Sequence, residues 1–215
     1  MRKTMKSQDI LILLKLISLN HQAKRYEENK NQPSKAIVHG WEGWELNDDA
    51  TFKNFEQSIM AESYSNRGLE ASTGISKSEV NASLKRSIAT GMAKMDRKSK
   101  LPKTNTSALL EFIIHGIKYV YPAKPSAIVR GIPTSIAAPV LEGKLMTAGG
   151  FIHVWPDPMG KEMGQSVSPL YKTVPMAVKK DPRLYEYLAL VDAIRLGKGR
   201  ESAYAAEALE KKLRT

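Results

Sequence analysis

The sequence contains no cysteine. This absence excludes disulfide bonds, cysteine-ligated zinc, iron–sulfur clusters and thiol nucleophiles, and it fits a protein of the reducing cytoplasm. No apolar run approaches the roughly 18 residues that a membrane-spanning helix needs, so we predict no membrane span. The apolar run at residues 10–19 is interrupted by Lys15 and is followed by no clear cleavage site, so we do not interpret it as a signal peptide.

The spacings that mark metal sites and catalytic sites are also missing. No two histidines stand as His-x-x-x-His, and the glycines at 197 and 199 lack the preceding strand and the length of a phosphate-binding loop. No nucleophile stands at a recognisable distance from a base. We therefore expect no enzyme activity, no metal and no cofactor. The four histidines are His21, His39, His115 and His153.

Positive charge is abundant. The 215 residues include 33 Lys and Arg against 22 Asp and Glu, which gives a formal net charge of +11. Such a balance favours a polyanionic partner, because cationic side chains near phosphates release condensed counterions. Positive charge can also serve solubility alone. The distribution of the basic residues along the chain distinguishes the two explanations. From residue 77 to residue 103 the chain carries 8 basic and 2 acidic residues, and this clustering favours nucleic acid.

The spacing of apolar residues predicts a mainly α protein. A helix is expected over residues 7–20, capped by Ser7 and ended by Asn20, and another over residues 106–121, capped by Thr106 or Ser107. Both are apolar enough to be buried, either in a core or as dimerisation surfaces. Residues 21–62 are interpreted as an insertion with a short helix at 49–60. Trp41 and Trp44 are expected to be packing groups.

The second half of the chain begins with a proline-rich segment. Residues 121–180 hold 8 of the 11 prolines, so they are expected to be irregular, but their apolar content predicts an ordered structure. We interpret it as a packing segment or an arm across a dimer, and a groove for a partner or ligand is the alternative. Asp181 and Pro182 then predict a helix start, and a helical hairpin follows. The chain therefore divides into residues 1–120, with the insertion, and residues 121–215, for dimerisation or partner binding.

Residues 64–91 have the pattern of two helices joined by a tight turn. Ser65 is expected to cap a short helix that runs to about Thr73, and Gly74 supplies a left-handed turn. Ile75 is expected to fill the corner. Ser76 and Glu79 have the spacing of a capping box, which predicts the start of the next helix.

That next helix has two distinct faces. Its expected inner face carries Val80, Leu84 and Ile88, and Gly91 ends it. A basic β-hairpin is predicted after it, with Met92, Met95 and Leu101 as anchors of its strands. The outer face of the helix carries Lys77, Ser78, Asn81 and Lys85, side chains of the kind that hydrogen-bond to base edges.

This stretch resembles the winged helix-turn-helix of MarR-like bacterial transcription regulators, over about residues 64–103. Glu70 and Thr73 depart from the pattern, which has a small residue and a larger apolar residue there, so the first helix is expected to be shifted or loosely packed. The resemblance implies a recognition helix in the major groove and a small β wing on phosphates or in the minor groove. The implied DNA-binding residues are Ser76, Lys77, Ser78, Asn81, Lys85, Arg86, Arg97, Lys98, Lys100 and Lys103.

Together these features predict a double-stranded DNA-binding transcription regulator of the cytoplasm and nucleoid that acts as a homodimer. The alternative is an antitoxin-like or adaptor protein that binds a partner protein through residues 121–180, with secondary or autoregulatory DNA binding. A helical pair with a merely solvated basic face is a further alternative. RNA binding is the weakest, because the basic segment has no interleaved aromatic residues for base stacking.

Overall fold

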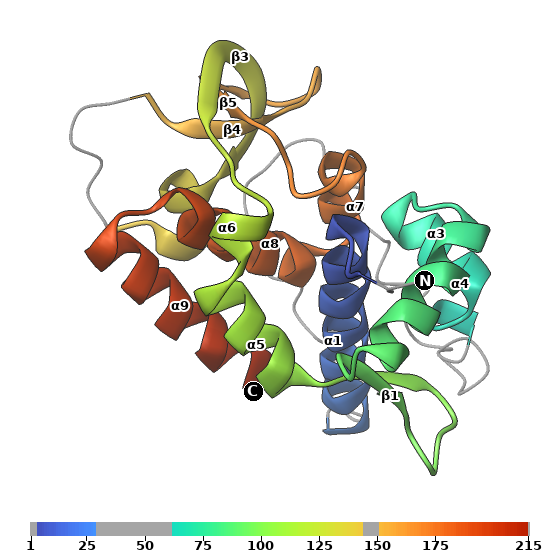
Figure 1. Ribbon diagram of the computed structural model, residues 1–215. Coiled ribbons are helices and arrows are strands. Elements are labelled where there is room, and N and C mark those ends of the chain that lie inside the picture. The colour runs from blue at the N-terminus through green and yellow to red at the C-terminus, as the bar shows by residue number, and fades with distance from the viewer. Residues whose placement is uncertain (1–3, 29–61, 144–150, 215) are drawn as a thin grey trace.

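The computed structural model describes residues 4–28, 62–143 and 151–214. Within these residues the protein is mainly helical with two small sheets, which confirms the predicted mainly α class. Figure 1 shows α1 (Ser7–Glu28) between two groups of helices. The pair α3 (Asn66–Thr73) and α4 (Lys77–Ala89) lies on one side, and α5 (Thr106–His115), α8 (Pro182–Leu196) and α9 (Gly199–Arg214) lie on the other.

The central helix α1 is buried around almost its whole circumference. Every residue from Ile10 to Leu19 is buried. The predicted helix is confirmed, but it continues past Asn20 to Glu28. Asparagine costs only about 0.7 kcal/mol or less in a helix, so contacts of the next turn can carry the helix onward. Residues 21–28 thus belong to α1 and not to the insertion.

The polar side chains of α1 find partners within the chain, as burial requires. The Lys15 ammonium lies 2.9 Å from Asp181 Oδ2, and the Ser18 hydroxyl donates to the same oxygen at 2.7 Å. The ring of His21 is hydrogen-bonded to the Tyr187 hydroxyl at 2.9 Å. Burial lowers the pKa of His21 and raises that of Tyr187, so both remain neutral near pH 7. These bonds fix α1 against α8.

A two-stranded hairpin follows α4. Its strands β1 (Ala93–Met95) and β2 (Pro102–Thr104) pair antiparallel. The Thr104 hydroxyl donates to the carbonyl oxygen of Leu13 at 2.9 Å, which attaches the hairpin to α1. The hairpin protrudes from the body of the protein in Figure 1.

The helix predicted over residues 106–121 is divided at Gly116 into α5 and α6 (Ile117–Val120). Its predicted caps are wrong by one or two residues, because the side-chain oxygen of Asn105 accepts the amide of Ala108 at 3.3 Å. Asparagine is among the best capping residues, so it takes the position from Thr106 and Ser107.

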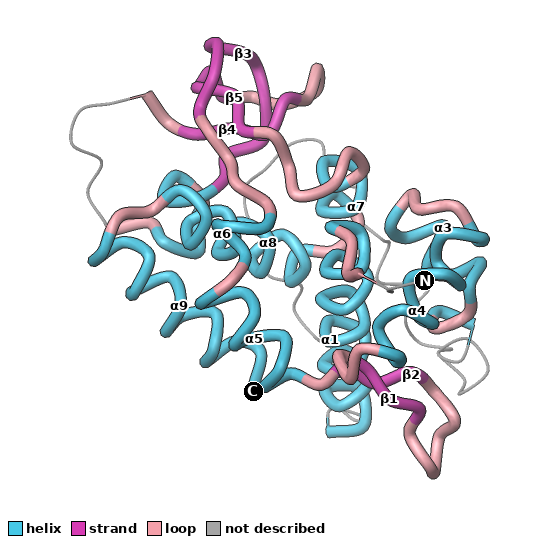
Figure 2. Tube along the Cα trace, viewed as in Figure 1, coloured by secondary structure: helices cyan, strands magenta, loops and turns pink. Residues whose placement is uncertain are grey.

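The proline-rich segment contains regular structure that the sequence did not predict. The strands β3 (Pro125–Thr134), β4 (His153–Pro156) and β5 (Glu162–Val167) each pair with the other two, and we name them the β3–β5 module. Strand β3 is antiparallel to both of its partners, and β4 and β5 are parallel. Figure 2 shows the module at one end of the molecule, and the short 3-10 turns η2 (Ser135–Ala137) and η3 (Pro139–Leu141) follow β3.

A buried carboxylate attaches the β3–β5 module to α8. Asp192 accepts hydrogen bonds from Trp155 Nε1 at 2.6 Å and from the Thr134 hydroxyl at 3.1 Å, and it forms an ion pair with Arg195. Burial raises the pKa of Asp192, while the Arg195 charge opposes that shift. Because Trp155 is buried in the chain's own core, the segment has the packing role that we predicted as one of its alternatives.

The C-terminal helices follow the sequence signals closely. The Asp181 side chain caps α8 and Pro182 is its first residue, as predicted. Helices α8 and α9 pack on each other as the expected hairpin. A short helix, α7 (Val174–Lys179), precedes them and packs on α3 as well as on α8.

The apolar residues of both halves of the chain form one continuous core. The predicted use of residues 10–19 as a dimerisation surface is therefore wrong, because they are buried within the chain itself. The division at residue 120 stays a prediction. None of the described helices is long and apolar enough to cross a bilayer. The predicted helix at 49–60, Trp41 and Trp44, and most of the predicted insertion lie outside the described residues.

Two glycines with the same backbone conformation provide a matched test of the turn between α3 and α4. Gly74 and Gly91 have φ values of 67° and 75°, but only a Cβ on Gly74 would meet other atoms, those of Met176 and Thr173. We expect Gly91→Ala to lower the free energy of unfolding by about 1–2 kcal/mol. Gly74→Ala should cost more than this, because its Cβ would also displace the end of the Met176 side chain and crowd Thr173. Urea denaturation measures both, and equal losses would contradict the contact with α7.

Candidate functional site

The turn between α3 and α4 is built as the sequence predicts. The Ser65 hydroxyl accepts the amide of Gly68 at 3.0 Å and so caps α3. Gly74 adopts the left-handed conformation, and Ile75 is buried in the corner. Thr73, which departs from the family pattern, is fully buried, and its hydroxyl donates to Leu69 O. The expected loose packing of α3 is therefore not found.

The start of α4 is capped differently from the prediction. The Ser76 side chain makes no capping bond, and the predicted capping box with Glu79 does not form. Instead Glu70 of α3 reaches across the turn, and its carboxylate accepts the amide of Lys77 at 3.1 Å. Glu79 bonds to Gln8 of α1 at 2.7 Å, which lowers the pKa of this glutamate. The Glu70 carboxylate is favourable at the start of α4 because it faces backbone amides that have no partner within the helix.

The inner face of α4 is narrower than predicted. Val80 is buried, but Leu84 is only half-buried and Ile88 is 41% exposed. The other buried positions of α4 are Ser83 and Ser87, whose hydroxyls have no partner among the described residues. Helix α4 packs on both α1 and α3, and small side chains at buried positions allow helices to pack closely. Burial on this face of α4 therefore depends on the size of the side chain and not on its hydrophobicity.

The outer face of α4 is open to solvent. Lys77, Ser78, Asn81 and Lys85 are all exposed, as is Ser76 just before them. These side chains come from the first three turns of the helix. The structure thus brings together the polar groups that were predicted to lie on one surface.

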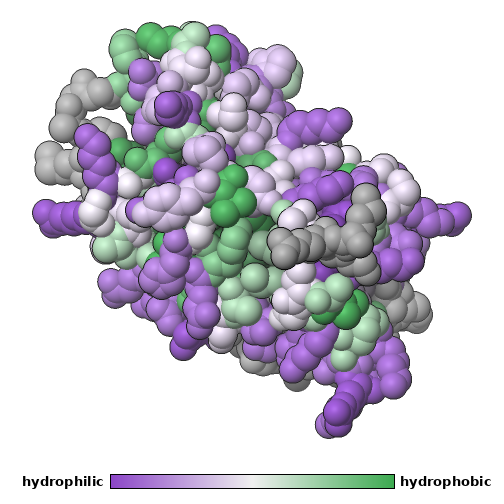
Figure 3. All heavy atoms as spheres, viewed as in Figure 1, coloured by the Kyte–Doolittle hydropathy of each residue, from purple (hydrophilic) through white to green (hydrophobic). Residues whose placement is uncertain are grey.

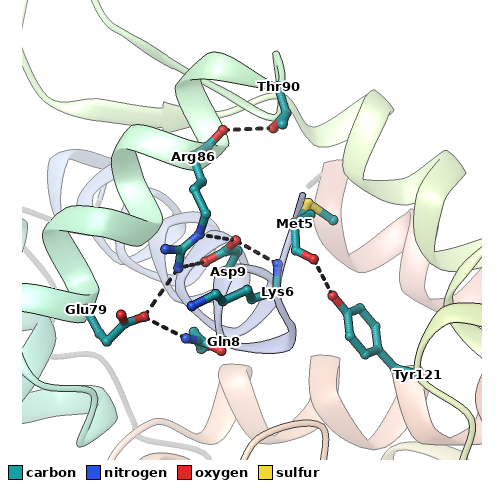
Figure 4. Close-up of polar contacts among 8 residues, drawn as sticks. All are labelled: Met5, Lys6, Gln8, Asp9, Glu79, Arg86, Thr90 and Tyr121. Atoms are coloured by element: carbon teal, nitrogen blue, oxygen red, sulfur yellow. Dashed lines mark hydrogen bonds and ion pairs between the residues drawn. The ribbon is translucent and has the colours of Figure 1, made fainter. Parts of the chain in front are cut away.

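Arg86 does not belong to that outer surface, contrary to its predicted role as a DNA contact. Its guanidinium forms a two-point bond with the fully buried Asp9 of α1, at 3.0 Å and 2.7 Å, and lies 3.4 Å from Glu79 (Figure 4). The hydrogen bonds that Arg86 donates to Asp9 raise the pKa of this guanidinium above its usual value. Asp9 also accepts the amide of Lys6 at 2.8 Å. Arg86 therefore fixes α4 on α1 and is not available to a partner.

The same corner holds the start of α1 in place. The Tyr121 hydroxyl, from the residue after α6, donates to the carbonyl oxygen of Met5 at 2.6 Å (Figure 4). Burial raises the pKa of Tyr121, so it remains a donor at neutral pH. The first turn of α1 is thus held from both α4 and the end of α6.

The turn of the β1–β2 hairpin is organised by Asp96. Its carboxylate accepts the amides of Lys98 and Ser99 at 3.1 Å and 2.9 Å and the Ser99 hydroxyl at 3.0 Å, and these bonds lower its pKa. Lys100 adopts a left-handed backbone with φ 57°. Arg97, Lys98, Lys100 and Lys103 are exposed. Hydrophilic atoms cover this protruding end of the molecule in Figure 3.

The predicted anchors of the hairpin are confirmed in part, because Met92 and Leu101 pack against the core but Met95 does not. Met95 is 50% exposed, and Met92 and Leu101 are only half-buried. Ala93, Pro102 and Thr104 are buried instead.

The described part of the chain offers no evident site for a metal ion. It contains no group of three or more histidine, aspartate or glutamate side chains that could hold a metal ion. His21 is bonded to Tyr187, and His153 is partly buried in β4, where burial lowers its pKa. The absence of enzyme activity stays a prediction.

Sequence patterns did not identify Gln8, Asp9 and Glu70 as residues that position the site. Gln8 and Asp9 of α1 bond to side chains of α4, which follows far along the chain, and Glu70 bonds across the turn to the amide of Lys77. The available signals were weak: Asp9 is a charge within an apolar run, and Glu70 replaces a small residue in the family pattern. Comparison with known proteins adds nothing to this assignment, because no family model, no curated protein and no solved structure matches the chain.

The neighbouring residues Arg86 and Lys85 test the division of α4 into an anchored and an open face. We expect Arg86→Ala to lower the free energy of unfolding by about 3 kcal/mol, because it leaves the Asp9 carboxylate buried without its cation. Arg86→Lys should recover part of this loss, since it keeps the charge but not the two-point bond. Lys85→Ala should change stability by less than about 0.5 kcal/mol. Urea denaturation at pH 7 would contradict the assignment if both alanine variants lost the same amount.

Proposed function

We propose that the protein is a sequence-specific DNA-binding transcription regulator, in which α3, α4 and the β1–β2 hairpin act as a winged helix-turn-helix of the MarR-like kind. One observation carries the proposal. Lys77, Asn81 and Lys85 lie on the face of α4 opposite the buried Val80 and Ser83, and their side chains have no bonding partner among the described residues. A helix with such a face can enter the major groove without first breaking internal contacts.

The chemistry of these side chains suits base edges. An asparagine amide matches the donor and acceptor of adenine in the major groove, and a lysine donates to the two acceptors of guanine. Serine hydroxyls at positions 76 and 78 can contact either bases or phosphates. The face of α4 therefore supports sequence preference as well as affinity.

The hairpin supplies charge for the DNA backbone. Arg97, Lys98, Lys100 and Lys103 are exposed on a protruding turn, where they can neutralise phosphates. The left-handed backbone of Lys100 costs about 1–2 kcal/mol relative to glycine, and glycine would be the usual residue there. The presence of a lysine at such a strained position supports a functional role for its side chain.

A homodimer is part of the proposal, because two recognition helices about 34–36 Å apart would reach successive major grooves. Of the two predicted dimerisation surfaces, residues 10–19 are excluded by burial. On the second, Leu109, Ile113 and Ile117 are buried in the chain, whereas Tyr119 and Val120 remain exposed. The exposed side chains of Tyr119 and Val120 therefore support a dimer contact near α6.

The alternative, a protein that binds a partner through residues 121–180, is favoured by a different observation. Ile128, Phe151, Met159 and Met163 are large apolar side chains of the β3–β5 module or its adjoining loops, and each is about half or more exposed. Exposed apolar side chains gathered on one small module are a common property of protein-binding surfaces. Under this alternative, DNA binding is weak and carries little sequence preference.

Duplex binding in a salt series distinguishes the roles of α4 and of the hairpin. We expect Asn81→Ala with Lys85→Ala to lose about 1–3 kcal/mol of discrimination per lost base contact. Lys98→Ala with Lys100→Ala should weaken all sequences alike and lower the slope of log affinity against log salt by about one per contact. A library of duplexes followed by titration of the selected site measures both quantities.

Two outcomes would count against the proposal. If both double variants weakened all sequences equally, the assigned roles would be wrong and the partner-protein alternative would gain. If the unchanged protein bound no duplex DNA, or bound every duplex with the same affinity, the proposed sequence-specific DNA binding would fail.

A further inference from the structure

The short helix α7 and the residue before it lie against the turn between α3 and α4. A Cβ placed on Gly74 would overlap Met176 Cε and would lie 3.3 Å from Thr173 Cβ. The Lys180 ammonium, just after α7, donates to the carbonyl oxygen of Ala71 in α3 at 3.2 Å. The C-terminal half of the chain is therefore in direct contact with the turn that precedes α4.

The position of this contact is fixed from several sides. Val174, Ala177 and Val178 of α7 are fully buried in the common core. The Lys179 ammonium lies 2.6 Å from the Asp157 carboxylate, which ties α7 to the turn between β4 and β5. A side chain next to α7 is thus presented at a defined place relative to α4.

The charge of this segment is positive. Residues 163–180 contain three lysines and no acidic residue. Asp157 neutralises Lys179, whereas the carbonyl bonded to Lys180 leaves its charge in place. Lys172, immediately before Thr173, is exposed and has no bonding partner among the described residues. Two uncompensated positive charges therefore adjoin the turn before α4.

These charges and those of the hairpin lie at opposite ends of α4. The helix has 13 residues, so its ends are about 20 Å apart. The hairpin follows its C-terminal end, and Lys172 adjoins the turn before its N-terminal end. A recognition helix presents its N-terminal residues to the base edges of the major groove, so positive charge beside its first turn is placed near the phosphates that flank that part of the groove.

We propose that the segment around Lys172 is a second phosphate-binding surface, which holds the DNA backbone on the side of α4 opposite the hairpin. The proposal rests on the proposed DNA-binding function and assigns to the C-terminal half a direct contact with the DNA. Lys172 is its principal residue, with Lys180 as a supporting charge. Neither residue was among the DNA contacts expected from the sequence.

The test compares Lys172→Ala with Lys198→Ala in a salt series on the selected duplex. Lys198 is a matched control, because it is also exposed but lies in the turn between α8 and α9, across the molecule from α4 (Figure 1). We expect Lys172→Ala to lower the slope of log affinity against log salt by about 0.9 and to weaken all sequences by the same factor. Lys172→Arg should retain the slope, and Lys172→Glu should lower the affinity further. Lys198→Ala should leave slope and affinity unchanged.

The hairpin variant Lys98→Ala with Lys100→Ala, measured alongside, separates the two proposals. If it lowers the slope while Lys172→Ala behaves as Lys198→Ala does, the second surface is refuted and the proposed function stands. If neither variant changes the slope, or if no duplex is bound, the proposed function fails and this inference fails with it. Thermal unfolding of Lys172→Ala should match the unchanged protein, because the side chain is exposed. A lower midpoint with an unchanged salt slope would assign Lys172 a structural role and overturn the proposal.

Discussion

The arrangement of the whole molecule depends on polar groups carried by one buried helix. The first turn of α1 holds α4 through Asp9 and Arg86, and its third turn holds α8 through Lys15 and Asp181. Such buried ion pairs add little net stability, but removing one partner costs several kcal/mol because the other charge remains buried. They therefore select one relative placement of the helices over other equally apolar packings. The outward face of α4 is a consequence of that placement.

The two faces of α4 depend on each other. Arg86 and Lys85 are adjacent in the sequence and both basic, yet one is bound to Asp9 and the other is exposed. The guanidinium of Arg86 is bound by the carboxylates of Asp9 and Glu79. The Glu70 carboxylate is bonded to the first amide of α4. Fewer of the positive charges counted in the sequence are thus free to contact a partner, and those that are free lie on a smaller surface.

Local signals in the sequence were sufficient for much of the fold. The Ser65 cap, the left-handed Gly74 and the Asp181–Pro182 helix start each depend on a few neighbouring residues, and all three are confirmed. The inner face of α4 was only partly predicted, because the apolar spacing included Ile88, which is exposed, and missed Ser83 and Ser87, which are fully buried. The bond between Asp9 and Arg86 joins residues 77 positions apart, and no local pattern contains that information. The β3–β5 module was not predicted because its prolines hide the alternation of its strands.

The burial of α1 also has a consequence for biosynthesis. Its partners in α8 follow it by 166 residues, as the pairs Lys15–Asp181 and His21–Tyr187 show. At translation rates of about 5–20 residues per second, the helix leaves the ribosome roughly 10–30 seconds before those partners exist. During that interval the part of its apolar surface that packs on α8 has no native cover, although α3, α4 and α5 have already been made. Exposed apolar surface of this kind is prone to aggregation. Native assembly of the core therefore has to wait until translation is almost complete.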